Sequence, residues 1–343
     1  MIKHTHTEPT EINFSKLESR IMAINDPFFG KFNGVRDMLY ELVIENKPTL
    51  IMATGGSKVI AYYLHLIIER LSSDGIICEV IEPRDYFYKA NKDSFSNLIA
   101  ISASGNTNGI CEALTTFKGK KYLICGKERE ANYQIISWEN ELYEKEKSFI
   151  SLVTSLGPIT LLLDSAVLLN FGIDSDKIKK INDKIKELLT KSVNKIDKLQ
   201  INFKDISLIQ IMSGYDTKTP CYALESNLVE AGLSAPVIHD KGSYCHGRSN
   251  LLFQYPNSHM IYLAHEMKDL DYALINTIND EYHNLTMFST DDLAENIFWK
   301  EYYLTLQMYF LSKRIADDKG IDLTMPEYNQ QLIKKLYNFK GEM

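Results

Sequence analysis

Two short segments rich in hydroxyl groups and glycine have the composition of phosphate-binding turns. The first, TGGS at 54–57, follows an apolar run and precedes a helix-like pattern, so its two glycines let the backbone bend closely around a ligand. The second, SASGNT at 102–107, occupies the same place between a strand-like run and a helix start. Hydroxyls and helix-end amides are neutral donors that can surround a phosphate dianion without Arg or Lys. The sequence therefore predicts a phosphorylated ligand at both turns, although Ser57 alone would serve equally well as a helix N-cap.

The elements that must position these turns follow a strand–helix rhythm. Short runs of Ile, Val and Leu, each followed by helical spacing, are typical of buried parallel strands and their crossover helices. The expected strands are 49–55, 76–82, 97–104 and 121–126 in the first half, and 207–214, 235–240, 260–265 and 285–290 in the second. We predict an α/β fold with two doubly wound units, each a mainly parallel sheet flanked by helices. Both turns then lie at carboxyl ends of strands, where ligands bind in such sheets.

A long amphipathic helix over 176–199 separates the two halves. Apolar residues recur there at three- and four-residue spacing, and the segment contains neither Gly nor Pro. We therefore expect two lobes packed on a shared helix: a helical segment at 1–45, a first domain at 46–200 that includes this helix, and a second domain at 201–343. A further helix is expected over 293–316, before a tail in which Pro326 interrupts the helical pattern.

The composition narrows the class of protein. With 343 residues, 45% of them hydrophobic and 24% charged, the chain can bury two ordinary cores. A net charge of −7 disfavours nucleic acid as a partner. The five scattered cysteines indicate free thiols, and neither a leader nor an apolar run near 18 residues is apparent, so we expect a cytoplasmic protein without a membrane segment. His4 and His6 are treated as an incidental terminal pair, and no metal site is predicted.

Several stretches resemble the sugar isomerase (SIS) domain family, and specifically the isomerase half of glucosamine-6-phosphate synthase. The turns at 53–57 and 101–109 are similar to its phosphate loops, 80–86 to its acidic-aromatic strand exit with Asp85 in place of the usual Glu, and 151–163 to its Ser/Thr-rich helix start. The resemblance implies phosphate contacts from Ser57, Ser102, Ser104 and Thr107. It implies sugar-site positions at Gly55, Gly56, Gly105, Asn106 and at Ser151, Thr154 or Ser155.

The same resemblance implies a catalytic pair. Glu230 ends a helical pattern and His246 follows 16 residues later in a Gly-x-x-x-His-Gly turn, as in the family's isomerases. Moving a proton between C1 and C2 of a sugar requires a carboxylate over both carbons and a group that helps open the ring. By resemblance Glu230 is the base. His246 acts in ring opening and reaches the site from a neighbouring subunit, which implies a homodimer. Taken singly, Glu230 also fits an ordinary surface acid and His246 a turn residue.

Three departures from the family pattern bear on the chemistry. Asn227 stands where the synthase has a Lys, three residues before the Glu. Arg248 replaces the Pro of His-Gly-Pro and adds a positive charge, which we place in the substrate site. The family's C-terminal Lys has only a candidate counterpart in Lys335 or Lys334. The chain also has no room for a glutaminase domain.

Three functions therefore remain open. The first is an enzyme acting at C1 and C2 of a hexose or aminohexose phosphate, as isomerase, deaminase or deglycase, since all three share enolisation. The second is a sugar-phosphate sensor without catalysis, favoured by Asn227 and Arg248, and the third and weakest is a structural scaffold. No cofactor is expected, because a carboxylate enolises a sugar unaided and the sequence lacks a dinucleotide fingerprint. A thiol protease using Cys245 and His246 is disfavoured, since adjacent side chains rarely meet as nucleophile and base.

Overall fold

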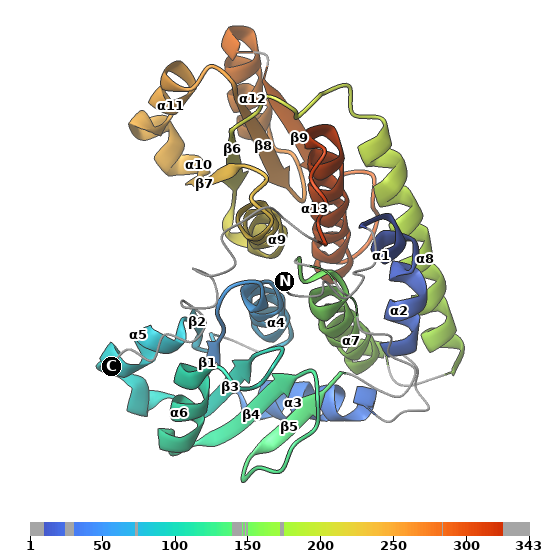
Figure 1. Cartoon of the computed structure of the whole chain (residues 1–343). Coiled ribbons are helices and arrows are strands. Elements are labelled where there is room, and N and C mark those ends of the chain that lie inside the picture. Colours follow the sequence, from blue (N-terminus) through green and yellow to red (C-terminus); the bar gives the residue numbers. More distant parts are fainter. Residues whose placement is uncertain are drawn as a thin grey trace, which may run out of the picture.

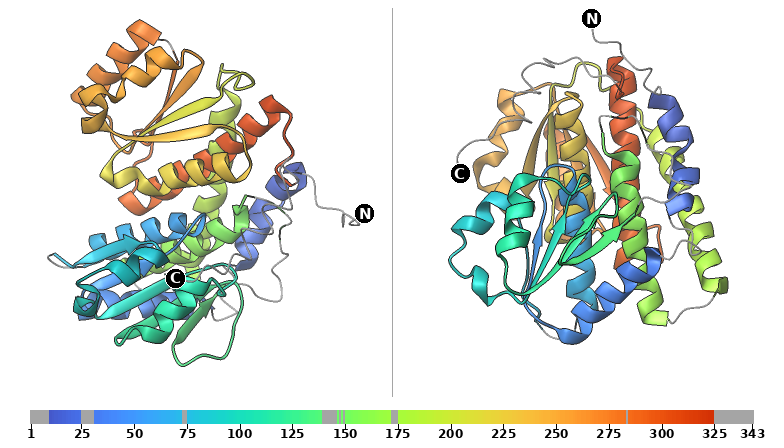
Figure 2. Two further views of the ribbon diagram at one scale, coloured as in Figure 1. Left: turned by 60° about the vertical axis from the view of Figure 1, so that its left-hand side comes forward. Right: turned by 60° about the horizontal axis from the view of Figure 1, so that its bottom comes forward.

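The computed structural model describes residues 10–24, 31–72, 75–138, 146, 148, 150–171, 175–282 and 284–324. These residues form two lobes, each built on one parallel sheet, and helices of both lobes lie between the sheets (Figure 1). Figure 2 shows the same two lobes from two further directions. The prediction of an α/β fold with two parallel-sheet units is confirmed.

The sheet of the first lobe has five parallel strands in the order β2-β1-β3-β4-β5. Its strands are β1 (Thr49–Met52), β2 (Cys78–Ile81), β3 (Asn97–Ile101), β4 (Lys120–Cys125) and β5 (Gln134–Ser137). Its helices are α1 (Thr10–Ser15), α2 (Leu17–Ile24), α3 (Lys31–Glu45), α4 (Ser57–Leu71), α5 (Pro83–Tyr88), the short η2 (Lys92–Ser94), α6 (Asn108–Thr116) and α7 (Leu152–Phe171). The chain enters this sheet at the interior strand β1, next to the edge, and then adds strands on both sides of it, as a doubly wound fold requires.

The sheet of the second lobe has four parallel strands in the order β7-β6-β8-β9. Its strands are β6 (Leu208–Ser213), β7 (Ala235–Asp240), β8 (Ser258–Ala264) and β9 (Leu285–Ser289). The helical elements from the lobe junction onward are α8 (Ser175–Asp197), η3 (Tyr215–Thr217), α9 (Lys218–Glu230), α10 (Lys241–Ser243), η4 (Tyr244–Arg248), α11 (Asn250–Gln254), α12 (Asp269–Tyr282) and α13 (Ile297–Lys319). The strand order repeats that of β2-β1-β3-β4, so the two sheets share one winding.

The central strands are apolar because both faces of each sheet are covered. Every residue of β1, β3, β6 and β8 is buried, which explains why these segments are mostly apolar and do not alternate between polar and apolar residues. The predicted amphipathic helix over 176–199 is α8, and its buried stripe includes Ile181, Ile185 and Leu188. It contacts α2 and α7 of the first lobe and α13 of the second.

Two elements differ from the sequence prediction. Strand β5 was not expected, because Gln134–Ser137 is a short segment in which only two residues are apolar. Helix α13 begins at Ile297 instead of 293, because the Asn296 side chain accepts hydrogen bonds from the N–H groups of Phe298 and Trp299, at 3.0 and 3.3 Å, and caps the helix there.

Helix α7 is long and apolar enough to cross a membrane over Leu152–Leu169. The expectation that no segment approaches this length is therefore wrong. Within the protein 83% of that window is buried, as in the core helix of a globular fold. The helix is apolar because it packs against α2, α3, α4 and α13.

The two lobes are joined through helices α4 and α7 of the first and α9 and α13 of the second. The Tyr62 and Tyr222 rings stack across α4 and α9 with centroids 4.6 Å apart. The Tyr63 hydroxyl donates to the carbonyl of Phe298 at 2.9 Å, and a further hydroxyl bond of 3.0 Å joins α7 to α13. These contacts fix the end of α9 against the first lobe, which matters for the site.

Candidate functional site

The loop at 102–107 follows β3 and folds back on its own hydroxyl groups. Ser102 Oγ lies 3.0 Å from Thr107 Oγ1 and accepts the N–H of Gly105 at 3.1 Å. Ser104 Oγ accepts the N–H of Asn106 at 3.2 Å. Helix α6 begins directly after Thr107, so hydroxyls, loop amides and a helix N-terminus converge in six residues. All five predicted residues of this loop lie together, in a form suited to an anion.

The turn at 54–57 lies at the same edge of the sheet. Strands β1 and β3 are parallel neighbours, with Met52 paired to Ala100, so both turns leave the sheet at its carboxyl edge. Gly55 has a left-handed φ of 54°, which glycine adopts without strain. Ser57 is the first residue of α4. The predicted convergence of the two turns at one edge agrees with this topology.

Glu230, the last residue of α9, reaches from the second lobe to the turn at 54–57. The Ser226 hydroxyl donates to Glu230 Oε1 at 2.8 Å, and the N–H of Gly56 also donates to this carboxylate. A Cβ on Gly56 would lie 3.5 Å from Glu230 Oε1 and 3.5 Å from Ser151 Oγ. The sequence analysis predicted Gly56, Ser151 and Glu230 as site residues. They lie far apart in the sequence but meet at the junction of the lobes.

The surroundings of Glu230 suit a general base. Burial raises the pKa of its carboxyl group above the ordinary value, while the hydrogen bonds from Ser226 and Gly56 oppose that rise. A carboxylate whose pKa moves toward neutrality holds an abstracted proton more strongly than an exposed one. The site thus combines a partly desolvated base with a set of anion-binding donors.

At the start of α7, the hydroxyl residues that were left open as sugar-site candidates have different surroundings. Tyr309 Oη donates to the carbonyl of Ser151 at 3.3 Å, which anchors this residue beside Gly56. Thr154 instead turns its hydroxyl to Glu146 Oε1, at 3.0 Å, and the N–H groups of Val153 and Thr154 donate to the same carboxylate. Glu146 thus caps α7. Ser155 is hydrogen-bonded to Tyr309, and Ser151 Oγ lies beside Gly56, as Glu230 Oε1 does. The substrate roles of Ser151 and Thr154 stay predictions.

His246 lies on η4, where Gly247 adopts a φ of 96° and turns the chain. Its side chain is exposed, as is that of Arg248, and no hydrogen bond or ion pair joins either to Glu230 in the described part of the chain. Both are therefore presented at the surface of one subunit, and their roles stay predictions. Lys334 and Lys335 lie outside the described residues.

Asn227 is hydrogen-bonded to helix α13. It is buried, and its Nδ2 donates to Ser312 Oγ on α13 at 3.2 Å. The position that carries a Lys in the synthase thus serves helix packing in this chain.

Two basic residues beside the turns were missed by the sequence analysis. Arg129, in the loop after β4, donates to the carbonyls of Ser104 and Gly105. Lys58, in the first turn of α4, forms an ion pair with Glu82 and lies 5.7 Å from the ring centroid of Tyr222. The sequence offered one indication of these two residues, which is that both follow apolar strands of the first sheet. Neither residue belongs to a recognisable motif.

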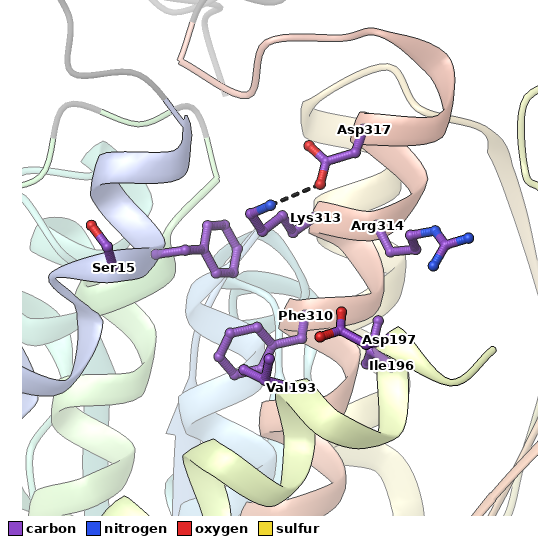
Figure 3. Close-up of a pocket in the computed structure, with 9 residues that line it drawn as sticks. Ser15, Val193, Ile196, Asp197, Phe310, Lys313, Arg314 and Asp317 are labelled. Carbon is purple, nitrogen blue, oxygen red and sulfur yellow. Dashed lines mark hydrogen bonds and ion pairs between the residues drawn. The ribbon is translucent and has the colours of Figure 1, made fainter.

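Two other features lie apart from this site. A cavity of about 320 Å³ opens between α1, α8 and α13, and its lining includes Phe14, Phe310 and the ion pair of Lys313 and Asp317, of which the last three are labelled in Figure 3. It is lined by helices and not by strand ends. Among the described residues no group of three or more His, Cys, Asp or Glu side chains could hold a metal ion.

Solved structures with the same architecture identify the fold. The C-terminal domain of glucosamine-fructose-6-phosphate aminotransferase from Francisella tularensis superposes with a TM-score of 0.67 at 18% identity, over 91% of this chain and 96% of that one. The chain has the sugar isomerase fold. Glucosamine-6-phosphate deaminase from Thermotoga maritima gives a TM-score of 0.63 at 15% identity, over 91% and 98% of the two chains.

A candidate tagatose-6-phosphate ketose/aldose isomerase from Clostridium novyi also has this fold, with a TM-score of 0.63, 16% identity and 92% of each chain covered. No protein-family model matches the sequence, and no curated protein matches it significantly. The suspected resemblance to the sugar isomerase fold is thus confirmed by structure and not by sequence similarity.

Proposed function

We propose that this protein binds a hexose or aminohexose phosphate and catalyses proton transfer at C1 and C2, with Glu230 as the base. The observation that carries the proposal is the contact of Glu230, from the second lobe, with Gly56 in a hydroxyl-rich strand-end turn of the first. The names of the similar structures, a deaminase and an aminotransferase domain for sugar 6-phosphates, support the same substrate class.

In this mechanism the loop at 102–107 and the N-terminus of α4 hold the phosphate. Ser102, Ser104 and Thr107 supply hydroxyl donors, and the N-terminus of α6 adds N–H groups. The carbon chain then extends toward the lobe junction, where Glu230 removes a proton from the carbon next to the carbonyl of the open sugar and returns it to the former carbonyl carbon. A second proton passes from the hydroxyl of the first carbon to the carbonyl oxygen, which completes the transfer. His246, from a second subunit of a homodimer, assists ring opening.

The tests are turnover and binding with a panel of hexose and aminohexose phosphates, followed by NMR. Wild type is expected to convert at least one member, and Glu230→Gln is expected to lower its rate by about 10²- to 10⁴-fold while binding is retained. Glu225→Gln is the matched control, because Glu225 lies on the same helix and burial also raises its pKa. Unchanged turnover in Glu230→Gln would sink the proposed mechanism.

A second candidate is a sensor that binds a sugar phosphate without converting it. The burial of Asn227 against Ser312 favours it, because this position offers no charged group to the sugar. A sensor would bind members of the panel and convert none, whereas conversion by the purified protein would exclude it.

A further inference from the structure

Arg129, in the loop after β4, is hydrogen-bonded to the loop at 102–107. Its Nη1 donates to the carbonyl of Gly105 at 2.8 Å and to Asn106 Oδ1 at 3.0 Å, and its Nη2 donates to the carbonyl of Ser104 at 2.6 Å. The guanidinium thus binds three consecutive residues of the loop. All three acceptors are oxygen atoms, so the loop turns two backbone carbonyls and one side-chain oxygen to Arg129, while the N–H groups of Gly105 and Asn106 donate to the loop's own serine hydroxyls.

The guanidinium also lies directly against the α-carbon of Gly105. A Cβ added to Gly105 would stand 2.6 Å from Cζ of Arg129 and nearer still to Nη2. Gly105 has a φ of 65°, so a residue with a side chain would be strained there even without Arg129. The glycine of the loop and the arginine are therefore fitted to each other, and the sequence analysis accounted only for the glycine.

In the described part of the chain the guanidinium of Arg129 bonds neutral groups. Its hydrogen-bond partners there are neutral oxygen atoms of the loop, although Glu128 and Glu130 flank it in the sequence. Glu128 instead accepts from the Ser137 hydroxyl at 3.3 Å. The loop itself offers only neutral donors, so Arg129 brings a charged guanidinium into direct contact with the loop.

We propose that Arg129 is a positioning residue that holds the loop at 102–107 in its anion-accepting conformation and gives it a preference for the doubly charged phosphate group. It acts through the loop's carbonyl groups and not by replacing the hydroxyl ligands. The inference rests on the proposed function, since it concerns the phosphate end of the same site.

Binding of inorganic phosphate at pH 8, measured by calorimetry at two salt concentrations, tests this role. Arg129→Gln is expected to weaken binding by about 10- to 100-fold and to reduce its salt dependence, because a charged donor is lost. Arg129→Lys is expected to bind with intermediate affinity and to keep the salt dependence, because it retains the charge but not the planar fork. Lys127→Gln is the matched control: it removes the same charge from the same loop, its side chain is exposed, and it should bind as wild type does.

The outcomes separate the two proposals. If wild type binds neither phosphate nor any sugar phosphate, the proposed function fails and this inference fails with it. If wild type binds phosphate and Arg129→Gln binds it equally well, only the inference is overturned. A salt dependence in Arg129→Gln equal to that of wild type would likewise overturn it, even with weaker binding, because a purely structural support loses affinity without losing charge. Thermal melting of Arg129→Lys checks that the comparison is made on folded protein.

Discussion

The contact between Gly105 and Arg129 makes a quantitative prediction about stability. Gly105→Ala places a methyl group where the guanidinium of Arg129 now lies, at a φ of 65°. Gly320→Ala is the matched control. Gly320 has nearly the same φ, 67°, at the end of α13, and a Cβ added there meets nothing within 4 Å. The two substitutions thus share the backbone strain and differ in the clash.

The magnitudes follow from this difference. Left-handed backbone costs a residue with a Cβ about 1 kcal/mol relative to glycine, so Gly320→Ala should lower the free energy of unfolding by about that amount. Gly105→Ala must also displace Arg129 and lose its three hydrogen bonds to the loop, each worth about 0.5–1 kcal/mol net. We therefore expect a total loss of about 3 kcal/mol for Gly105→Ala.

A double-mutant cycle with Arg129→Ala isolates the contact. Without the guanidinium, Gly105→Ala should cost only the strain of about 1 kcal/mol, so the coupling energy should be about 2 kcal/mol. Urea denaturation of the four proteins, with Gly320→Ala alongside, measures these quantities. Equal losses for Gly105→Ala and Gly320→Ala, together with a coupling energy near zero, would refute the reasoning.

Three further predictions concern other parts of the site and the core. Glu146→Ala should lower the free energy of unfolding by about 2 kcal/mol in urea denaturation, because it leaves the N–H groups of Val153 and Thr154 without their acceptor; a loss below about 0.5 kcal/mol would argue against the cap. His246→Ala should change the free energy of unfolding by less than about 0.5 kcal/mol, since the side chain is exposed. It should nevertheless slow turnover of a ring-closed sugar phosphate by about 10²-fold. Turnover equal to that of wild type would remove His246 from the mechanism. Burial disfavours the charged form of His265, but its bonds to Glu301 and to the Asp216 carbonyl outweigh this and raise its pKa, so the folded protein holds the proton more tightly than the unfolded chain. The resulting stabilisation is complete below a pH of about 6.5 and is lost as the pH rises through the raised pKa. His265→Gln should therefore flatten the pH dependence of the unfolding free energy in that pH range. An unchanged slope in this variant would contradict the assignment.

The fold could be predicted from the sequence because its central strands are buried on both faces. Segments such as Asn97–Ile101 are buried along their whole length and are apolar after the first residue, and the turns that follow them must contain the residues that bend the chain. Strand β5 escaped prediction because Gln134–Ser137, at the sheet edge, is short and half polar. Apolar patterns identify buried elements well and edge elements poorly.

Only part of the candidate site could be predicted from the sequence, namely its two hydroxyl-rich turns. The hydroxyl-rich turns are local, so their composition reveals them, and the strand order places them at one edge. The meeting of Glu230 with Gly56 depends instead on how α9 packs against α4, which no spacing within either helix encodes. Glu230 was found only through its resemblance to a family. Arg129 was not found, because a single arginine in a polar loop has no pattern until the fold brings it to the neighbouring turn.

The central claim is that Glu230 removes a proton from the carbon chain of a bound sugar phosphate. The most direct measurement is solvent exchange in deuterium oxide at C1 and C2 of the sugar phosphates that bind, followed by NMR for wild type, Glu230→Gln and Glu225→Gln. The account predicts deuterium incorporation by wild type and Glu225→Gln, its loss in Glu230→Gln, and a decline of the wild-type rate as the pH falls through the raised pKa of Glu230. Binding shifts in wild type without any exchange at these carbons would contradict it and leave a sugar-phosphate sensor as the function.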